Sequence, residues 1–410
     1  MNWQKLALPQ SELSLPTVLR SGQAFRWRNI NGIWSCALNN QIILLRESDD
    51  DGDSNNNDKI IEYSSIKHEN IKEAIEVSEF IKSYLNLNVS MIELHKQWSK
   101  VDNNFVNIEI SSLELKKEIE QLETPPDSGR ATPDNIIFDE TLPKGVRILK
   151  QDPWETLVSF IISSNNNIKR ISQLCETLCL KYGNFIGEFN GVPYYTFPKP
   201  REFFKLKNNE KLTTIKLNKL ESELRDLGFG YRAKYIMNTV KKMIENKENW
   251  EQLYKDESKW ESDDQCVTFL RQFDGVGPKV ADCVALMGCN RFDLVPVDTH
   301  VWKVLKNKYK SDFNKWVDQL KENEVEKLGI PKTNLKKSLS NKAVDIKVYP
   351  FVKRFFKDFW GIRSGWAQAV VFANAVKLDN GINNIEDVKK LLIKSGLQII
   401  EPTKKKFKTI

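Results

Sequence analysis

The sequence of 410 residues contains no run of roughly 18 or more apolar residues, which excludes a membrane-spanning helix. Its six cysteines form no Cys-X-X-Cys pair, and six are too few for a disulfide framework in so long a chain. With only three scattered histidines, the sequence predicts neither a zinc site of ordinary spacing nor a four-cysteine iron–sulfur cluster. A phosphate-binding Gly-rich loop with Lys-Ser/Thr and a Gly-X-Ser-X-Gly turn are both missing. A function of this chain must therefore rest on side chains outside these metal-binding, phosphate-binding and serine-nucleophile motifs.

Charge is distributed unevenly along the chain. There are 62 Lys and Arg against 55 Asp and Glu, a net charge of +7. Residues 47–58 carry six acids and no base, which leaves +13 for the rest of the chain. A basic body is compatible with a polyanionic partner such as nucleic acid, but charge alone does not establish one.

The N-terminal part has the pattern of a small sheet. Strands are predicted at 24–27, 33–38, 41–46 and 59–63, separated by Asn-Gly and Asn-Asn turn signals. The acidic residues 47–58 bury no apolar area, so we predict a disordered insertion in a hairpin. Helical patterns follow at 71–85 and 89–98.

A change of pattern divides the chain. Residues 119–140 hold three prolines and a glycine and are interpreted as a linker. Beyond them the periodicity is helical, with helices predicted at 153–164, 168–182, 209–226, 231–246, 262–272, 278–288, 299–308, 350–358 and 364–377. We therefore expect an α+β fold, in which an antiparallel β domain with helices (1–118) and the linker precede a mostly helical domain (141–395) and a basic tail (396–410).

A glycine-rich turn joins two predicted helices within residues 262–288. Gly275 and Gly277 allow a tight turn, and Pro278 suits the first turn of a helix. Unpaired amides at such a helix N-terminus suit a phosphodiester, although a simple corner between helices explains the segment equally well. Lys279 lies at this positive end among apolar neighbours, which favours the neutral, nucleophilic amine. The alternative is an ordinary solvated lysine.

Three further segments contain candidate functional residues. Asp298 precedes a helical run, where an acid commonly caps the helix but can also stabilise a cation that develops beside Lys279. Gln368 and Phe372 lie four residues apart on an apolar helix face. A buried glutamine is either satisfied internally or reads a ligand, and the phenylalanine suits a core as well as a binding platform. Residues 163–170 contain three asparagines and two bases. Either they form a helix-terminal turn, or their side chains fill a gap in a duplex.

Together these features resemble the helix–hairpin–helix DNA glycosylase superfamily, and within it the eukaryotic 8-oxoguanine DNA glycosylase/lyases. The resemblance covers about 19–46 and 143–378 in order. Besides the hairpin with Lys279 and Asp298, it rests on the motifs at 19–27, 151–155, 163–167, 228–233, 280–283 and 365–369. Pro278 replaces the more familiar threonine, and proline is benign at a first helical turn.

The resemblance implies a sheet domain similar to half of the TATA-binding saddle, packed on the helical body. It also implies a bifunctional enzyme of base excision repair. Such an enzyme excises 8-oxoguanine opposite cytosine from duplex DNA through a lysine Schiff base and then cleaves the strand by β-elimination.

The same resemblance assigns roles to individual residues. Lys279 is expected to be the nucleophile and Asp298 the catalytic carboxylate. The residues expected to bind 8-oxoguanine are Gly22, Cys283, Met287, Pro296, Asp298, Gln368 and Phe372. Those expected to contact DNA are Asn165, in the vacated stack, Arg170 and Arg232, which read the opposite cytosine, and Tyr231, Gly275, Gly277, Val280 and His300.

No cofactor is required on this view, although a monovalent or divalent cation at the hairpin carbonyls near Gln272, Phe273 and Val276 is left open. The expected partner is double-stranded DNA with 8-oxoguanine paired to cytosine. We expect a monomer that binds no membrane and acts in the nucleus, with a mitochondrial fraction left open.

Two alternatives remain. A glycosylase for oxidised pyrimidines or alkylated purines would share Lys279 and Asp298 but lack the set of Gly22, Gln368 and Phe372. A non-enzymatic DNA-binding module would need neither Lys279 nor Asp298.

Overall fold

The computed structural model describes residues 2–6, 8, 11–49, 59–67, 76–105, 142–206, 210–322, 325, 329–375 and 381–396. The predicted linker at 119–140, residues 50–58 of the acidic segment and all but the first residue of the predicted tail at 396–410 lie outside this part of the chain.

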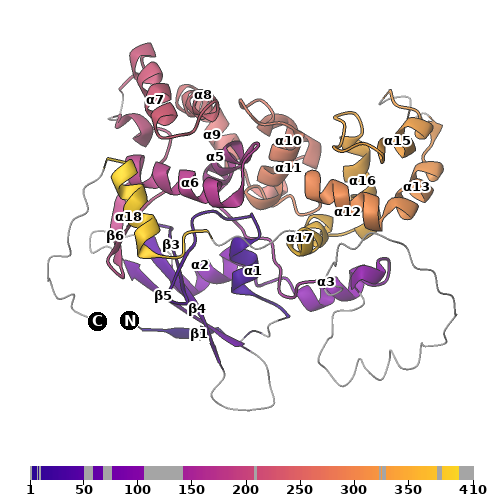
Figure 1. Ribbon diagram of the computed structural model, residues 1–410, viewed down its shortest axis with the longest axis horizontal. Helices are drawn as coiled ribbons and strands as arrows, with labels where there is room; N and C mark the ends of the chain where they lie inside the picture. The colour runs from indigo at the N-terminus through magenta and orange to yellow at the C-terminus, as the bar shows by residue number, and fades with distance from the viewer. Residues whose placement is uncertain are drawn as a thin grey trace.

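The N-terminal region forms a five-stranded antiparallel sheet with the strand order β1-β5-β4-β3-β2 (Figure 1). Its strands are β1 (Gln4–Leu6), β2 (Arg28–Ile30), β3 (Ile33–Leu38), β4 (Gln41–Asp49) and β5 (Lys59–Lys67). The predicted strands at 33–38, 41–46 and 59–63 are thus confirmed, with β4 and β5 longer than expected. The three-residue strand β1 is too short to leave a pattern in the sequence.

Two predictions about this sheet are wrong. Residues 24–27 are not a strand, because their side chains are used in tertiary contacts: Phe25 packs in the core of the helical body and Trp27 in the core of the sheet. The acidic insertion does not begin at residue 47, since Glu47, Ser48 and Asp49 continue β4 and pair with β5. A backbone ladder requires no apolar side chains, and so the strand runs into the acidic segment.

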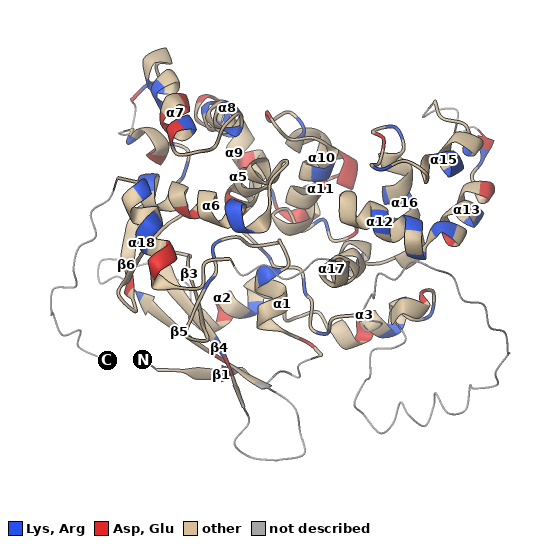
Figure 2. Ribbon diagram, in the orientation of Figure 1, with Lys and Arg blue, Asp and Glu red and all other residues tan. Residues whose placement is uncertain are grey.

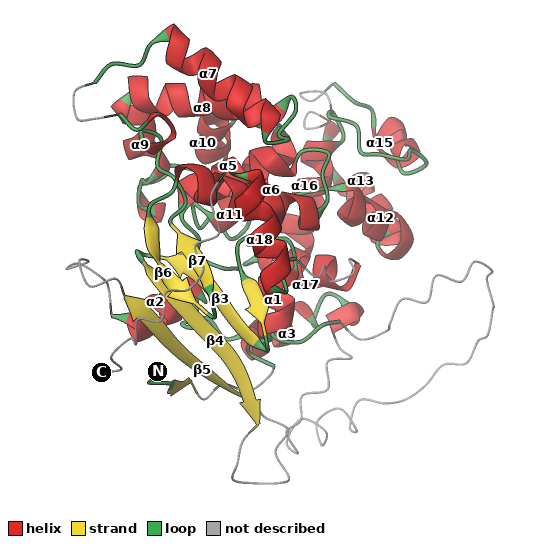
Figure 3. Cartoon of the chain, turned by 60° about the vertical axis from the view of Figure 1, so that its left-hand side comes forward, coloured by secondary structure: helices red, strands yellow, loops and turns green. Residues whose placement is uncertain are grey.

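Each face of the sheet has its own cover, as the alternation of side chains along a strand requires. Trp34, Cys36 and Ile43 point to the face covered by α1 (Leu15–Arg20) and α2 (Val77–Tyr84). Ile42 and Leu44 point to the opposite face, which packs against a hairpin of β6 (Phe185–Phe189) and β7 (Val192–Tyr195) and against α18 (Ile385–Lys394) (Figure 3). Segments from the C-terminal part of the chain therefore complete the N-terminal layer.

The helical body surrounds one large core. Its helices are α3 (Met91–Trp98), α5 (Pro153–Ser163), α6 (Ile168–Tyr182), α7 (Thr214–Asp226), α8 (Arg232–Glu245), α9 (Lys247–Leu253), α10 (Asp263–Leu270), α11 (Pro278–Met287), α12 (Thr299–Lys308), α13 (Lys310–Gln319), α15 (Lys332–Ser338), α16 (Tyr349–Trp360) and α17 (Ser364–Ala375), with short 3-10 turns at Asn103–Phe105, Glu202–Phe204 and Glu257–Lys259. Lys and Arg are interspersed with Asp and Glu along these helices (Figure 2). In the part of the chain described, no helix has the length and hydrophobicity that a membrane crossing requires.

All nine predicted helices of the body are present, and boundary shifts follow from capping. Helix α7 begins at Thr214 rather than 209 because the Thr213 side chain accepts a hydrogen bond from the Lys216 amide. The sequence patterns missed α9, α13, α15 and α18, as well as the β6–β7 hairpin.

Buried ion pairs join the sheet to the body. The Arg26 guanidinium donates to both carboxylate oxygens of Glu155 at 2.7 and 2.5 Å. Arg28, 1% exposed, pairs with Glu176 and donates to the Pro193 carbonyl at 3.0 Å. A buried charge left without its partner is strongly destabilising, so these pairs specify one docking arrangement of the two layers.

Candidate active site

A small cavity lies where the loop after α1 meets α5, α11, the segment before α12, and α17. It brings together all of the residues predicted to bind the base: Gly22, Cys283, Met287, Pro296, Asp298, Gln368 and Phe372, together with Lys279. Its volume is about 40 Å³. Since one water molecule occupies about 10–15 Å³ on this measure, the cavity must widen to accept a purine.

Hydrogen bonds of Gln23 hold the Gly22 loop at this cavity. The Gln23 side chain donates to the Arg147 carbonyl at 2.7 Å and accepts from the Leu149 amide at 3.0 Å. Its carbonyl accepts from Gln151 at 3.0 Å. Gly22 itself has a φ of +78°, and an added Cβ would lie 3.4 Å from Ile168. The backbone therefore approaches the cavity in a conformation that favours glycine.

Lys279 projects from the first turn of α11, one turn before Cys283 on the same face. Its ammonium lies 5.1 Å from the centre of the Phe160 ring and makes no ion pair with a described residue. Burial raises the pKa of the Cys283 thiol to about 11, and the neighbouring Lys279 only partly offsets this. The Cys283 thiol is thus uncharged at neutral pH and contributes a polarisable surface to the cavity lining. Phe160, which the sequence reading missed, forms part of the lining, and in the sequence it has only the pattern of a core residue.

Asp298 combines the two roles left open by its sequence context. One carboxylate oxygen caps α12 by accepting from the amides of His300 and Val301, both at 2.9 Å. The other oxygen has no hydrogen-bond partner among the described residues, and the side chain lines the cavity. The cap orients the carboxylate, while its free oxygen is available to a substrate.

A buried network supports the segment before Asp298. The Val297 amide donates to the Tyr349 hydroxyl at 3.2 Å, and that hydroxyl donates to Asp282 at 2.7 Å. Asp282 is 1% exposed and also pairs with Lys353 at 2.7 Å. Desolvation raises the pKa of the Asp282 carboxyl, which makes both hydrogen-bonding partners necessary if it is to stay ionised. No local pattern in the sequence pointed to Tyr349, because its partners lie far along the chain.

Tyr349→Phe tests whether this network positions the carboxylate. We expect a loss of roughly 1–3 kcal/mol in the free energy of unfolding, because the buried Val297 amide loses its acceptor. Turnover on the substrate duplex should fall while its dissociation constant stays unchanged. Single-turnover kinetics and anisotropy binding measure the two separately, with Tyr254→Phe as the control, since that hydroxyl also donates to a carboxylate, Asp152, but away from the cavity. An equal loss of turnover in both variants would contradict a positioning role.

Gln368 and Phe372 come from successive turns of α17. Gln368 is 6% exposed, yet its amide has no hydrogen-bond partner among the described residues. The described part of the protein therefore does not supply the hydrogen bonds of this amide. The Phe372 ring lines the cavity and contacts His300 edge to face, with centroids 5.8 Å apart. An amide that lines the cavity and has no partner among the described residues is available to hydrogen-bond a ligand.

The residues predicted to contact the opposite strand also come together. The Arg232 guanidinium donates to the carbonyls of Ser164 and Asn165, and the Tyr231 hydroxyl donates to Ser164 at 3.1 Å. Asn165 is exposed with a φ of +49°. Arg170 is also exposed, and its guanidinium donates to the Gly228 carbonyl at 3.1 Å. Arg232 is 5% exposed, so it holds the Asn165 loop with most of its donors.

The hairpin lies next to this surface. Gly275 has a φ of +81°, and an added Cβ would lie 2.5 Å from the Tyr235 ring, which in turn contacts Tyr231 edge to face. Gly277 caps α11 without a side chain, faces open space and leaves the first-turn amides accessible to an anion. Val280 has a buried side chain, so only its backbone can take part.

A lysine contributes a positive charge at the hairpin carbonyls. The Lys242 ammonium lies 2.5 Å from the Gln272 carbonyl, 3.4 Å from Asp274 and 6.0 Å from the centre of the Phe273 ring. Among the described residues, no three side chains of His, Cys, Asp and Glu are grouped so that they could hold a metal ion.

Lys242→Met tests this arrangement. Without the ammonium we expect duplex binding to weaken roughly tenfold, the lower end of the worth of one hydrogen bond to a charged group, and to recover in part with added potassium. Anisotropy at two potassium concentrations measures both effects. Lys241→Met is the matched control, since each lysine side chain is 41% exposed. Identical behaviour of the two variants would show that the hairpin does not depend on Lys242.

Comparison with known proteins agrees with this geometry. The family model "8-oxoguanine DNA glycosylase, N-terminal domain" matches residues 5–157, and "HhH-GPD superfamily base excision DNA repair protein" matches 158–329. An N-glycosylase/DNA lyase of Saccharomyces cerevisiae is 32% identical over 405 residues, covering 94% of this chain and 89% of the relative. An Arabidopsis thaliana N-glycosylase/DNA lyase is 28% identical over 371 residues, covering 90% and 79%.

The fold is also that of a solved structure. The Clostridium acetobutylicum 8-oxoguanine glycosylase/lyase, in complex with duplex DNA containing cytosine opposite 8-oxoguanine, superimposes with a TM-score of 0.56. It is 22% identical, and the match covers 91% of this chain and 97% of that one.

Proposed function

Since the chain belongs to the 8-oxoguanine DNA glycosylase family, we propose that it excises 8-oxoguanine paired with cytosine from duplex DNA and cleaves the resulting abasic strand. The observation that carries the proposal is the single cavity that unites Lys279, Asp298, Gln368 and Phe372. Each was named from the sequence, and the fold brings them together.

Excision begins with extrusion of the damaged nucleotide, at a cost of about a few kcal/mol for unstacking. The neutral amine of Lys279 attacks the anomeric carbon of the sugar. The bond from that carbon to the base breaks, and the base leaves with the bonding electron pair and takes up a proton. The free oxygen of Asp298 faces the positive charge that develops on the sugar, and the cap holds it in place.

Strand cleavage uses the covalent adduct. Opening of the sugar ring turns the carbon–nitrogen bond between sugar and Lys279 into an imine, which withdraws electrons from the adjacent carbon. Loss of a proton from that carbon expels the 3′ phosphate, which is β-elimination. The imine is itself the electron sink, so these steps are written with the residues of this chain alone.

Base recognition is assigned to the walls of the cavity. The unpartnered amide of Gln368 is available to the hydrogen-bonding edge of the flipped base, and the rim at Gly22 offers a backbone carbonyl to the extra ring N–H of 8-oxoguanine. Phe372 and Cys283 supply the two faces that stack on the base. Met287 and Pro296 complete the lining.

The opposite cytosine is assigned to Arg170 and Arg232, with Asn165 in the vacated stack. We expect Arg170→Ala to reduce the preference for cytosine over adenine by roughly 1–3 kcal/mol, the worth of a bidentate base contact. Arg225→Ala, which removes an exposed arginine of α7, is the control. The ratio of excision rates on the two duplexes measures the effect. An unchanged ratio would mean that residues other than Arg170 recognise the opposite cytosine. Arg232→Ala is a less specific test because it also releases the Asn165 loop.

The proposed function is tested by cleavage of duplexes that carry 8-oxoguanine opposite each of the four bases, compared with duplexes that carry an oxidised pyrimidine or an alkylated purine. We expect cleavage to be fastest opposite cytosine and a covalent adduct to form with borohydride. Preferential cleavage at oxidised pyrimidines or alkylated purines would instead favour the related glycosylases, and absence of any adduct would favour a binding module.

Two further assignments belong to this proposal. We assign the protein to the nucleus, where the DNA substrate is found, and a fluorescent fusion would test this directly. We also propose that no cofactor is required, and treatment with a chelator should leave cleavage unchanged.

A further inference from the structure

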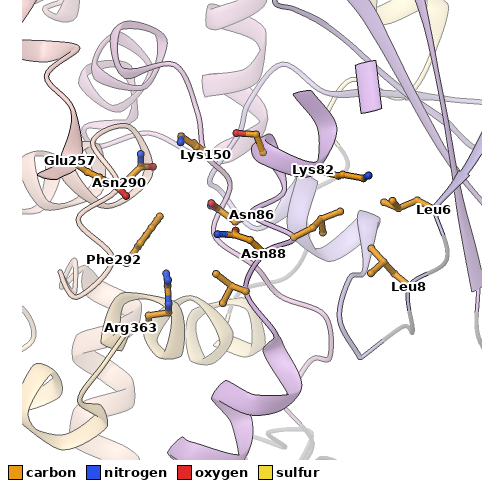
Figure 4. Close-up of a pocket in the computed structure, with 13 residues that line it drawn as sticks. Leu6, Leu8, Lys82, Asn86, Asn88, Lys150, Glu257, Asn290, Phe292 and Arg363 are labelled. Carbon is orange, nitrogen blue, oxygen red and sulfur yellow. The ribbon is translucent and has the colours of Figure 1, made fainter. Parts of the chain in front are cut away.

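A second cavity, of about 630 Å³, lies between the N-terminal region and the helical body (Figure 4). Asn290 and Phe292 on its wall follow the C-terminal end of α11, whereas Lys279 and the hairpin lie at the other end. Ten helical residues separate the two ends by about 15 Å. The second cavity is therefore outside the catalytic site and away from the hairpin.

Arg363 is the polar residue of this cavity that most requires a ligand. Its guanidinium lies over the rings of Phe292 and Trp366, at 4.9 and 5.2 Å from their centres. One terminal nitrogen is buried and has no hydrogen-bond partner in the described part of the chain. Desolvation lowers the pKa of this guanidinium, and the nearby carboxylates of Asp293 and Glu257 offset the effect only in part. A carboxylate would relieve it with paired, charge-assisted hydrogen bonds.

Amide side chains occupy the middle of the cavity. The buried oxygen of Asn290 has no hydrogen-bond partner among the described residues. Asn86 donates to the Ile148 carbonyl at 2.9 Å, and its amide oxygen has no described partner. Asn88 is exposed beside them. Figure 4 shows Asn86 and Asn88 between the Arg363 end and the Leu6–Leu8 end. Primary amides offer both donors and acceptors, which match the alternating groups of a peptide backbone.

The two ends of the cavity differ in chemistry. Phe292 and Arg363 lie at one end and Leu6 and Leu8 at the other (Figure 4). Lys82, Lys150 and Arg363 supply three positive charges against the one negative charge of Glu257. Lys82 lies at the Leu6 end and Glu257 on the Arg363 side (Figure 4), so the anion of a ligand is placed by the unpartnered nitrogen of Arg363 rather than by a gradient of charge along the cavity. A ligand for this cavity is thus elongated, with an anionic group on Arg363 and an apolar group at the other end.

We propose that this cavity binds an extended peptide segment of a partner protein, with an acidic residue on Arg363 and an apolar side chain between Leu6 and Leu8. The asparagines pair with the backbone of the segment between these two anchors. Because the cavity is separate from the hairpin and the catalytic cavity, the peptide and DNA bind at the same time.

A phage-displayed library of random heptapeptides, panned on the full chain, tests the proposal. We expect an enriched consensus with Asp or Glu a few positions from Leu, Ile or Phe. A fluorescein-labelled synthetic peptide of that consensus should bind equally well in the absence and presence of saturating duplex DNA. Absence of such a consensus, or displacement of the peptide by DNA, would overturn the proposal.

Variants then locate the site. Arg363→Gln should weaken binding of the labelled peptide roughly ten- to hundredfold, the worth of a charged hydrogen-bonded contact. Lys150→Glu, at an exposed position, provides a second test if the first variant folds poorly. Arg354→Gln is the matched control, since that arginine lies over the Trp316 ring at 5.9 Å outside the cavity.

Each remaining outcome has one meaning. Unchanged binding in both Arg363→Gln and Lys150→Glu would overturn the proposal. So would competition by acetate or inorganic phosphate as effective as that of unlabelled peptide, because the cavity would then hold a small anion only. The readout is peptide binding and involves no cleavage reaction, so it does not depend on the proposed catalytic function.

Discussion

Lys279→Gln should abolish base excision, strand cleavage and borohydride trapping together, with a loss on the order of 1,000-fold or more in rate. Glutamine keeps most of the stem and a hydrogen-bonding head but cannot form an imine. Binding to lesion duplexes should persist, because the amides of the hairpin and the Arg170 and Asn165 surface are unchanged. Gel assays of cleavage and trapping, with anisotropy for binding, separate chemistry from affinity.

The matched control for this variant is Lys303→Gln, which removes an exposed lysine of α12 near the same carboxylate-bearing segment. It should leave all three activities intact. A trapped adduct that persists in Lys279→Gln would rule out this lysine as the nucleophile, and loss of binding together with activity would make it a phosphate contact.

Gln368→Ala should lose excision by roughly 10- to 100-fold while keeping the lyase reaction on a preformed abasic site. The amide has no described partner in the protein, so its function depends on a base that an abasic sugar does not have. For the same reason the melting temperature should not fall, since the substitution removes a buried polar group that is not hydrogen-bonded.

A lesion duplex, a preformed abasic site and one control variant distinguish base recognition by Gln368 from a structural role. Gln252→Ala on α9 should affect neither reaction. If Gln368→Ala reduces excision and abasic-site cleavage equally, or if it unfolds at a clearly lower temperature than the control, the glutamine has a structural role instead.

Features that depend on neighbours in the sequence were predictable. Helix α6 runs over the predicted residues, because its apolar period and its Asn167 cap are both local. The same holds for the hairpin, where glycine and proline are required by backbone conformation, and for Asp298 as a helix cap. The family resemblance assigned these residues to one site, and in the structure they line one cavity.

Other features were not predictable because they depend on contacts between distant segments. Residues 24–27 have a strand pattern, but the Arg26–Glu155 pair and the burial of Phe25 and Trp27 use their side chains between two layers. Strand β1 exists only because β5 offers an edge, and α18 because the sheet offers an apolar face. Local propensity contains no information about either surface.

The sequence by itself therefore determined the chemistry of this protein: a lysine at a helix N-terminus, a capping aspartate, and a glutamine and a phenylalanine one turn apart. The tertiary structure alone decided how these groups are held. Gln23 anchors the Gly22 loop to residues more than a hundred positions away, and Tyr349 joins Asp282 to the segment before Asp298. The tertiary structure also formed the second cavity, with one buried nitrogen of Arg363 that has no hydrogen-bond partner among the described residues. The reason is physical: residue types and local backbone preferences follow from the chain order, whereas burial and hydrogen-bond partners follow from which segments meet.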